Sequence, residues 1–409
     1  MTYLNHTLQN GIHIVHKQVS GYVSHCGIII NSGSRDELIE EQGIAHFIEH
    51  TIFKGTPRRR SYQILSHMEN VGGEINAFTT KEDTCIYTSF LNKFLERAMD
   101  IMSDITFHST FPEKEIEKEK EVVLDEINSY RDNPAEEIFD EFEKLIFNNH
   151  PLGRYILGEP NCIKKFRKAQ LKKFISRSYN TDEIVLCFVG NIEYADFLKL
   201  AEKYFSRIPA NTRQWKRTKF RTYKPFHKTI LKQIHQTHCM MGNIAYSERD
   251  KRRPQLILLN NILGGPGMNA RLSMNIRERY GLCYNIESNY SPFSDTGVFG
   301  IYFGTEQENI ERTISLVNKE LDKFRNEKLG TLQLHRAKLQ LMGQLAISYE
   351  QSLNEMLSMG KSFLEFNKID SIEEINTKIE SITTEQIQDV ANDIFRPDKL
   401  STLIYKSDK

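Results

Sequence analysis

The same order of predicted elements occurs twice in this chain, and this repetition restricts the possible folds more than any other feature. Strands, helices, strands, helices and a final strand follow one another from residue 11, and the same order begins again after residue 226. A weak sequence repeat accompanies it, because His25-Cys26 precedes Arg35-Asp36 and His238-Cys239 precedes Arg249-Asp250. We therefore predict an α+β fold of two homologous domains, each a mainly antiparallel sheet with helices packed on one face.

Hydrophobic periodicity and turn residues place the individual elements. Strands are expected at residues 11–16, 22–31, 84–90 and 184–190 in the first half, and at 229–243, 284–290, 297–304 and 400–405 in the second. Helices are expected at residues 43–53, 61–70, 112–130, 195–205 and 255–263. The remainder of the C-terminal part reads as mostly helical.

A basic stretch without apolar periodicity separates the two halves. Residues 208–226 contain Pro209, Pro225 and the only tryptophan, and five Lys or Arg lie between Arg213 and Arg221. We interpret 210–225 as a linker between an N-terminal domain, 1–209, and a C-terminal domain, 226–409. A nucleic-acid-binding segment is the alternative, but a short basic run in a neutral protein is usually a solvated surface.

Composition excludes several classes of protein. The 54 Lys and Arg residues balance 54 Asp and Glu residues, so no net field favours nucleic acid or an anionic membrane. The longest apolar runs are far shorter than the roughly 20 residues of a membrane span, and the N-terminus lacks the pattern of a secretory signal. Six cysteines without a C-x-x-C pair favour a reducing compartment. We expect a soluble, cytoplasmic protein that binds neither nucleic acid nor membrane.

One predicted helix, residues 43–53, carries a polar trio on an otherwise apolar sequence. His46 and His50 are four residues apart and therefore share a helix face, and Glu49 directly precedes the second histidine. Such a trio also arises by chance on solvated helices. Here the other positions are apolar nearly all round, which places the trio in a buried or cleft-lining helix. Buried polar groups need partners, and a metal ion would satisfy all three.

A third metal ligand is sought on the predicted helix 112–130. On a helical wheel Glu126 lies within about 20° of Glu119, and both fall inside the apolar arc of Ile116, Val123 and Ile127. Two carboxylates on a buried face are costly without a cation. One carboxylate satisfied by an Arg or Lys elsewhere is the alternative. We favour Glu126 as the ligand and Glu119 as a group that orients a histidine or the water.

These motifs together resemble the pitrilysin and mitochondrial-processing-peptidase family of zinc metallopeptidases, the inverzincins, in a short two-domain bacterial form. In that family the H-x-x-E-H motif is followed about 76 residues later by a ligand glutamate, with another glutamate about seven residues before it. Glu126 and Glu119 occupy those positions here. Further matching stretches lie at residues 33–37, 53–56, 72–79 and 119–127.

The resemblance implies a zinc-dependent endopeptidase or oligopeptidase, with each chain forming half of a clam shell. His46, His50 and Glu126 would hold Zn²⁺, Glu49 would act as general base, and Glu119 would support the site. Unstructured peptides would bind as an added strand in a closed chamber.

Four further site residues follow from the same resemblance. Asn76 and Ala77 match the edge-strand residues that bind the substrate backbone, and Arg277 and Tyr284 match a pair that contacts the substrate near zinc. In the family this pair belongs to the half of the shell that faces the zinc half. One zinc half and one such pair in each chain imply a homodimer in which each subunit supplies Arg277 and Tyr284 to its partner's site.

Two other functions remain open. The family includes inert members that act as scaffold subunits, and it includes processing peptidases that need a second, different subunit. The presence of every expected site residue favours an active enzyme: His46, Glu49, His50, Glu119, Glu126, Arg277 and Tyr284.

Overall fold

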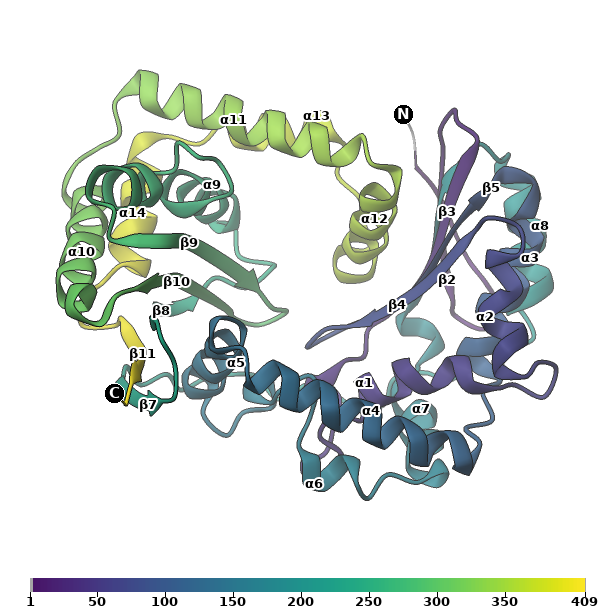
Figure 1. Cartoon of the computed structure of the whole chain (residues 1–409). Helices are drawn as coiled ribbons and strands as arrows, with labels where there is room; N and C mark the ends of the chain where they lie inside the picture. Colours follow the sequence, from purple (N-terminus) through teal and green to yellow (C-terminus); the bar gives the residue numbers. More distant parts are fainter. Residues whose placement is uncertain (1–2, 409) are drawn as a thin grey trace. The chain divides into compact units, whose positions relative to one another are not determined.

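A computed structural model describes residues 3–408 and divides the chain into two compact units (Figure 1). Unit 1 consists of the chain up to Asn128, Arg154–Arg217 and Ile347–Ser371. Unit 2 consists of Ser129–Gly153, Thr218–Ala346 and the chain from Ile372 onward. Each unit is an α+β structure with its own sheet and its own buried core.

The sheet of unit 1 has six strands in the order β1-β2-β6-β3-β5-β4. Only the β2–β6 pair is parallel, so the sheet is mainly antiparallel. The strands are β1 (Leu4–Thr7), β2 (His13–Gln18), β3 (Val23–Ile30), β4 (Glu74–Thr79), β5 (Thr84–Leu91) and β6 (Ile184–Gly190). The helices of this unit are α1 (Ile44–Thr51), α2 (Ser61–Glu69), α3 (Leu95–Phe107), α6 (Pro160–Ile163), α7 (Lys168–Ser178), α8 (Tyr194–Phe205), α12 (Ser352–Phe366) and most of α4 (Glu113–Arg131).

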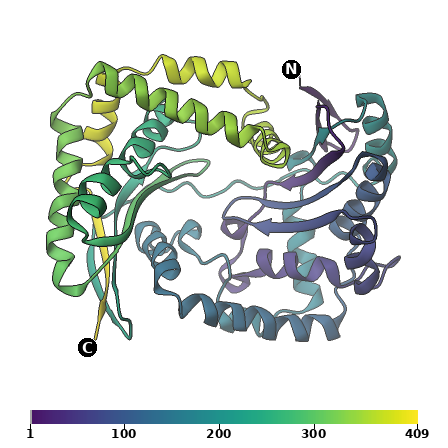
Figure 2. The same ribbon diagram turned by 45° about the horizontal axis from the view of Figure 1, so that its top comes forward.

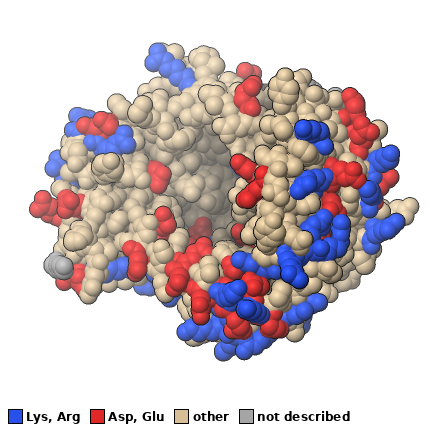
Figure 3. Space-filling view, turned by 45° about the vertical axis from the view of Figure 1, so that its right-hand side comes forward, with Lys and Arg blue, Asp and Glu red and all other residues tan. Residues whose placement is uncertain are grey.

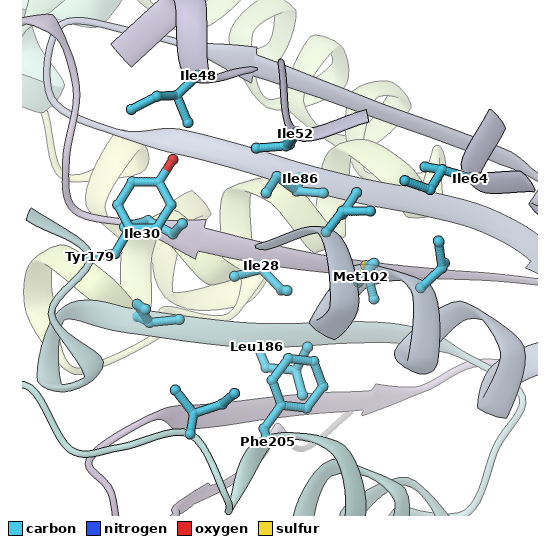
Figure 4. Packing of buried hydrophobic residues seen from close by; sticks show 14 of the residues in the cluster. Ile28, Ile30, Ile48, Ile52, Ile64, Ile86, Met102, Tyr179, Leu186 and Phe205 are labelled. Atoms are coloured by element: carbon cyan, nitrogen blue, oxygen red, sulfur yellow. The ribbon is translucent and has the colours of Figure 1, made fainter. Parts of the chain in front are cut away.

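The main core of unit 1 forms where helices pack on one face of this sheet. Alternate residues of the central strands, such as Ile28, Ile86 and Leu186, point toward the helices and are fully buried (Figure 4). Ile48 of α1 and Ile52 after it pack into the same cluster. This packing anchors the apolar side of α1 in the core.

The sheet of unit 2 has five strands in the order β7-β11-β8-β10-β9. The β7–β11 pair is parallel and the remaining pairs are antiparallel. The strands are β7 (His227–Lys232), β8 (Thr237–Ala245), β9 (Cys283–Pro292), β10 (Gly297–Thr305) and β11 (Ser401–Ser407). The helices are α5 (Pro134–Phe147), α9 (Arg253–Gly264), a π-helix (Ser273–Glu278), α10 (Ile310–Asn326), α13 (Ile372–Glu380), α14 (Thr384–Ile394) and most of α11 (Thr331–Tyr349).

The two sheets have the same topology, which supports the predicted duplication. Strands β2, β6, β3, β5 and β4 of unit 1 correspond in order and direction to β7, β11, β8, β10 and β9 of unit 2. The repeated His-Cys pairs lie on the corresponding strands β3 and β8. Helices α3, α4 and α5 of the first half correspond in chain order to α10, α11 and α12 of the second.

The corresponding helices α5 and α12 are exchanged between the units. α12 comes from the C-terminal half of the chain but packs on β3 and β6 of unit 1 (Figures 1 and 2). α5 comes from the N-terminal half and packs on β8 and β11 of unit 2. The units therefore differ from the contiguous predicted ranges 1–209 and 226–409. Each exchanged helix also covers the second face of its sheet, where the sequence had placed helices on one face only.

One predicted strand is wrong in its extent. The sequence indicates a single strand at 229–243, whereas the structure has β7 and β8, separated by residues 233–236. The two strands are not neighbours, because β11 lies between them. A short interruption in a β-rich stretch of sequence does not reveal that a strand from another part of the chain lies between its two halves in the sheet.

The basic stretch before β7 forms neither helix nor strand, and the side chains of two of its arginines, Arg213 and Arg217, are largely buried. Arg217 donates to both carboxylate oxygens of Asp36, at 2.8 and 2.7 Å, and to the backbone oxygen of Glu82. Arg213 stacks on the Trp215 ring with its guanidinium carbon 3.9 Å from the ring centre. These contacts attach the stretch up to Arg217 to unit 1.

The surface mixes both signs of charge. On the face drawn in Figure 3, Lys and Arg side chains lie among Asp and Glu side chains. Within residues 3–408, no helix combines the length and apolar composition that a membrane span requires. All six cysteines are free thiols.

Candidate metal and active site

Helix α1 presents the H-x-x-E-H residues, and its first turn is fixed by two neighbours. Gly43, at the N-cap, has φ 92° and lies so close to Leu157 and Gly158 that a Cβ atom would meet their backbone at 2.7 and 2.8 Å. The Glu37 carboxylate accepts the backbone N–H groups of Gly43 and Ala45 at 2.9 and 3.0 Å. Burial raises the pKa of Glu37 to about 8, although these N–H groups oppose the shift.

The structure brings His46, His50 and Glu126 together. Each offers one ligand atom, and the three atoms lie within 4.8 Å of one another. Glu126 projects from α4, with Oε1 3.8 Å from Nε2 of His46 and Oε2 3.5 Å from Nε2 of His50. Helices α1 and α4 lie side by side in Figure 1. Among residues 3–408 this is the only group of three or more His, Cys, Asp or Glu side chains with a metal-binding arrangement.

Glu119 is buried and contacts His50. Its Oε1 is 3.1 Å from Nδ1 of His50, and its Oε2 is 2.7 Å from Nζ of Lys54. An imidazole that donates from Nδ1 keeps a lone pair on Nε2, which is the nitrogen that faces Glu126. Sequence reasoning missed Lys54. Its position four residues after His50, as His50 follows His46, is the signal that could have identified it.

The two histidines differ in their electrostatic environment. Burial, and then the neighbouring His50, lower the pKa of His46 to about 3, so its imidazole is neutral. Burial also lowers the pKa of His50, but Glu119, Glu126 and Glu49 outweigh it and raise the pKa above the usual value. Without a cation, the carboxylates around His50 therefore draw a proton to it.

Glu49 lies beside the three ligand atoms without joining them. Burial raises the pKa of its carboxyl group, while Thr79 and His50 oppose the shift. One of its oxygens, Oε2, is buried without a hydrogen-bond partner among the described residues. A half-buried carboxylate with a raised pKa and a free oxygen is suited to accept and release a proton.

The residues present fit a zinc ion. Two imidazole nitrogens and one carboxylate oxygen are a ligand set of catalytic zinc sites, which keep a fourth position for water. His46 is a neutral imidazole. Its buried Nδ1 has no hydrogen-bond partner in the described part of the chain. Its polar contact is therefore made by Nε2, the nitrogen that faces Glu126. His50 has the carboxylate partner that ligating histidines usually have.

Strand β4 carries Asn76 and Ala77 at the open edge of the unit 1 sheet. β4 pairs only with β5, and α1 packs against it. Asn76 is exposed, and its side-chain oxygen accepts the Ala77 N–H at 3.1 Å. An extended peptide could therefore add to this edge beside the H-x-x-E-H helix.

Arg277 and Tyr284 lie in unit 2, apart in sequence and element from the cluster on α1 and α4. Arg277 is in the π-helix and pairs with Glu278 at 2.9 Å. Tyr284 is on β9, at the edge of its sheet, and is 90 % exposed. An exposed tyrosine of this size is free to contact a ligand.

Comparison with known sequences assigns the chain to a family. Residues 14–160 match the family described as Insulinase (Peptidase family M16), and residues 165–341 match the Peptidase M16 inactive domain. The chain is 33 % identical over 405 residues to the uncharacterized zinc protease YmxG of Bacillus subtilis, with 98 % of each chain covered. It is 34 % identical to an uncharacterized zinc protease of Rickettsia bellii, covering 97 % of this chain and 96 % of the relative.

Solved structures share the fold. A crystal structure described as a peptidase M16 inactive domain from Pseudomonas fluorescens matches with a TM-score of 0.92, at 21 % identity, covering 100 % of this chain and 99 % of the other. The structure of a protease from Helicobacter pylori matches with a TM-score of 0.90, at 19 % identity, over 99 % of each chain. The family resemblance inferred from the sequence is confirmed. This chain belongs to the M16, or pitrilysin, family, as a member of the short bacterial type whose relatives are named zinc proteases.

Proposed function

We propose that this chain is a zinc-dependent endopeptidase or oligopeptidase that hydrolyses unstructured peptides. The observation that carries the proposal is the convergence of His46, His50 and Glu126 from two helices, with the carboxylate of Glu49 beside them. Relatives named zinc proteases support the same reading.

In the proposed site His46, His50 and Glu126 hold the metal. Zinc, when bound, supplies a Lewis acid that polarises the scissile carbonyl and lowers the pKa of water toward about 7. Glu119 accepts the Nδ1 proton of His50, and this contact directs Nε2 of the ring toward the ligand cluster. Lys54 neutralises the other oxygen of Glu119.

Glu49 is the proposed general base. Its raised pKa and its free buried oxygen suit it to take a proton from the attacking water and to pass that proton to the leaving amine. The half-buried position limits competition from bulk water, which keeps the carboxylate available for this transfer.

The substrate is proposed to bind by strand addition at β4. Backbone hydrogen bonds to an edge strand give affinity with little demand on side-chain sequence, so unstructured peptides are the expected substrate class. Asn76 and the backbone of Ala77 would hold the peptide near the cluster, because α1 packs directly against this strand.

Arg277 and Tyr284 are proposed to complete the site from a second copy of the chain. A guanidinium supplies fixed donors for a peptide carbonyl, and a tyrosine hydroxyl can donate to a developing oxyanion. Mixing two inactive variants, Glu49→Gln and Tyr284→Phe, tests this arrangement. In a homodimer with exchanged residues, the mixed dimers contain one intact site, so activity returns to about a quarter of the wild-type rate. No recovery in confirmed mixed dimers would remove the exchange.

The peptidase proposal is tested by cleavage of a mixed pool of unstructured peptides, followed by mass spectrometry. The wild-type chain should cleave, a chelator should abolish cleavage, and added zinc should restore it. Glu49→Gln is the matched control, because it keeps the size and the hydrogen-bonding shape of the side chain. Folded, zinc-loaded wild type that cleaves nothing would instead favour an inert scaffold, or a subunit that needs a different partner.

A further inference from the structure

The two units share the order of five sheet strands but differ in elements around them, and one difference concerns helix α8 of unit 1. In unit 1, α8 follows β6 and packs on β2 and on α3. The corresponding elements of unit 2 are β11, β7 and α10. Among the residues that the structure describes, unit 2 carries no helix after β11. Within the described part of unit 2, the corner between β7 and α10 holds no element that corresponds to α8.

A groove of about 570 Å³ lies at this corner of unit 2. Strands β7, β8 and β11 form its floor, and α10 and the end of α14 form its walls. Its apolar lining consists of Met241, Ile314, Leu321, Phe395, Pro397, Leu400 and Ile404. Ile314 and Ile404 are only half-buried, so an apolar surface is open to solvent at the edge of the sheet.

In unit 1, α8 shows what this corner accommodates. It is a 12-residue amphipathic helix whose buried residues, Phe197, Ala201 and Phe205, recur every four positions. All three belong to the main core of unit 1. A helix with two large aromatic side chains on one face therefore fills the space between the strand pair and the helix beside it.

The polar contacts of α8 also have counterparts in the groove. Glu96, the second residue of α3, pairs with Lys203 of α8 at 2.5 Å. Glu311, the second residue of α10, lines the groove and has no ion pair with any residue between 3 and 408. The groove therefore contains Glu311 as the counterpart of Glu96, but the described part of unit 2 has no counterpart of Lys203.

A second polar contact repeats in the same way. Ser103, the ninth residue of α3, donates to the backbone oxygen of Tyr204 at 2.9 Å, near the C-terminal end of α8. Asn318, the ninth residue of α10, lines the groove. Its amide group can donate to a helix backbone in the same manner.

We propose that this groove binds an amphipathic helix of a partner protein. The partner helix carries two large apolar side chains eight residues apart, a small apolar residue midway between them, and a lysine or arginine two residues before the second large one, as α8 does. Its apolar face covers the strands, its basic residue pairs with Glu311, and its last turn accepts a hydrogen bond from Asn318. The proposed binding surface lies entirely in unit 2, and the inference is independent of peptidase activity.

A synthetic copy of α8 is the probe. The peptide spans residues 193–206, carries a fluorophore, and is held helical by a staple between positions 195 and 199, which are exposed in α8. Fluorescence anisotropy with the full chain should show saturable binding with a Kd of about 10–100 µM. Ile314→Asp in the groove should weaken binding at least about tenfold, because it places a charge against the apolar face of the peptide.

A charge exchange makes the test specific. Glu311→Lys should weaken binding about threefold, and a peptide with the lysine of position 203 replaced by glutamate should recover it, as expected for one exposed ion pair. Glu308→Lys is the matched control, since this exposed glutamate lies just before α10 and does not line the groove. Because Glu311 is exposed, its variant should fold normally even if Ile314→Asp does not.

Two results would overturn the proposal. One is the absence of saturable binding to the wild-type chain at peptide concentrations up to about 1 mM. The other is binding that neither Ile314→Asp nor Glu311→Lys changes relative to Glu308→Lys, because the peptide would then occupy another surface.

Discussion

The helices α4 of unit 1 and α11 of unit 2 show how one scaffold carries a cluster of candidate metal ligands in only one of its copies. Both helices span 19 residues and occupy the same place in the element order. The seventh and fourteenth residues are Glu119 and Glu126 in α4, but Ala337 and Gln344 in α11. Helix α9, the first helix between β8 and β9, likewise has no histidine or carboxylate. The site therefore depends on residue types placed on the fold and not on the fold itself.

The largest expected effect comes from making α4 resemble α11. Glu126→Gln converts the fourteenth residue to the one found in α11 and removes the only carboxylate in the proposed ligand set. We expect loss of bound zinc and a fall in kcat/KM of about 10³-fold or more, because neutral amides are poor zinc ligands. Elemental analysis and peptide cleavage measure the two effects.

The reverse change in unit 2 is its control. Gln344→Glu places the same carboxylate on α11, where no histidine pair on α9 accompanies it, and should change neither zinc content nor rate. Normal zinc binding and activity in Glu126→Gln would contradict the assignment of the ligand.

The next effect tests the exchanged helices. Met356 of α12 and Phe142 of α5 are fully buried, each against the sheet of the unit it packs on. Met356→Ala and Phe142→Ala should each lower stability by about 2–5 kcal/mol through the cavity that they leave. Hydrogen exchange locates the damage.

The two variants serve as controls for each other. Met356→Ala should raise exchange in β3 and β6, although it lies in the C-terminal half of the chain, and Phe142→Ala should raise exchange in β8 and β11. The opposite pattern would mean that the helices are not exchanged.

A smaller effect comes from the seventh residue of α4. Glu119→Gln removes the charge that fixes His50 and pairs with Lys54, and it should weaken zinc affinity by about 10–100-fold. Competition with a fluorescent chelator measures the zinc Kd. Glu121→Gln, on the exposed side of the same helix, should leave it unchanged. An equal loss in both variants would point to a general effect of helix charge.

The smallest effect concerns the two sheet edges. Asn76→Ala on β4 should lower kcat/KM about three- to tenfold, the value of one or two hydrogen bonds, without changing the melting temperature. Asn289→Ala is its control, because Asn289 is an exposed asparagine on the edge strand β9 of unit 2, and it should have no effect on the rate. Equal losses from both would show that β4 is not a dedicated substrate edge.

Local patterns in the sequence were sufficient for most elements and for the proximity of His46, His50 and Glu126. The strand predicted at 184–190 coincides with β6. Helical periodicity placed Glu119 and Glu126 on one face of α4, and both contact α1, but only Glu119 is buried as expected, whereas Glu126 is exposed. The repeated His-Cys pairs fall on corresponding strands, β3 and β8, since duplication preserves position in the sheet.

Non-local features were not predictable in the same way. An amphipathic stripe shows that α12 buries one face, but not that its partner is the sheet of the other half of the chain. Lys54 was missed because an ion pair with Glu119 depends on how α1 and α4 pack. The groove between β7 and α10 was missed because only the comparison of two folded units reveals an uncovered corner.

The most direct test of the central claim is the zinc content of the purified full chain, measured together with peptide cleavage on the same samples of wild type and Glu49→Gln. The account predicts one zinc ion per chain in both proteins and cleavage by the wild type only, at a rate about 10²–10⁴-fold above that of the variant. A well-folded wild-type chain that binds no zinc, or a Glu49→Gln chain that cleaves at the normal rate, would contradict it.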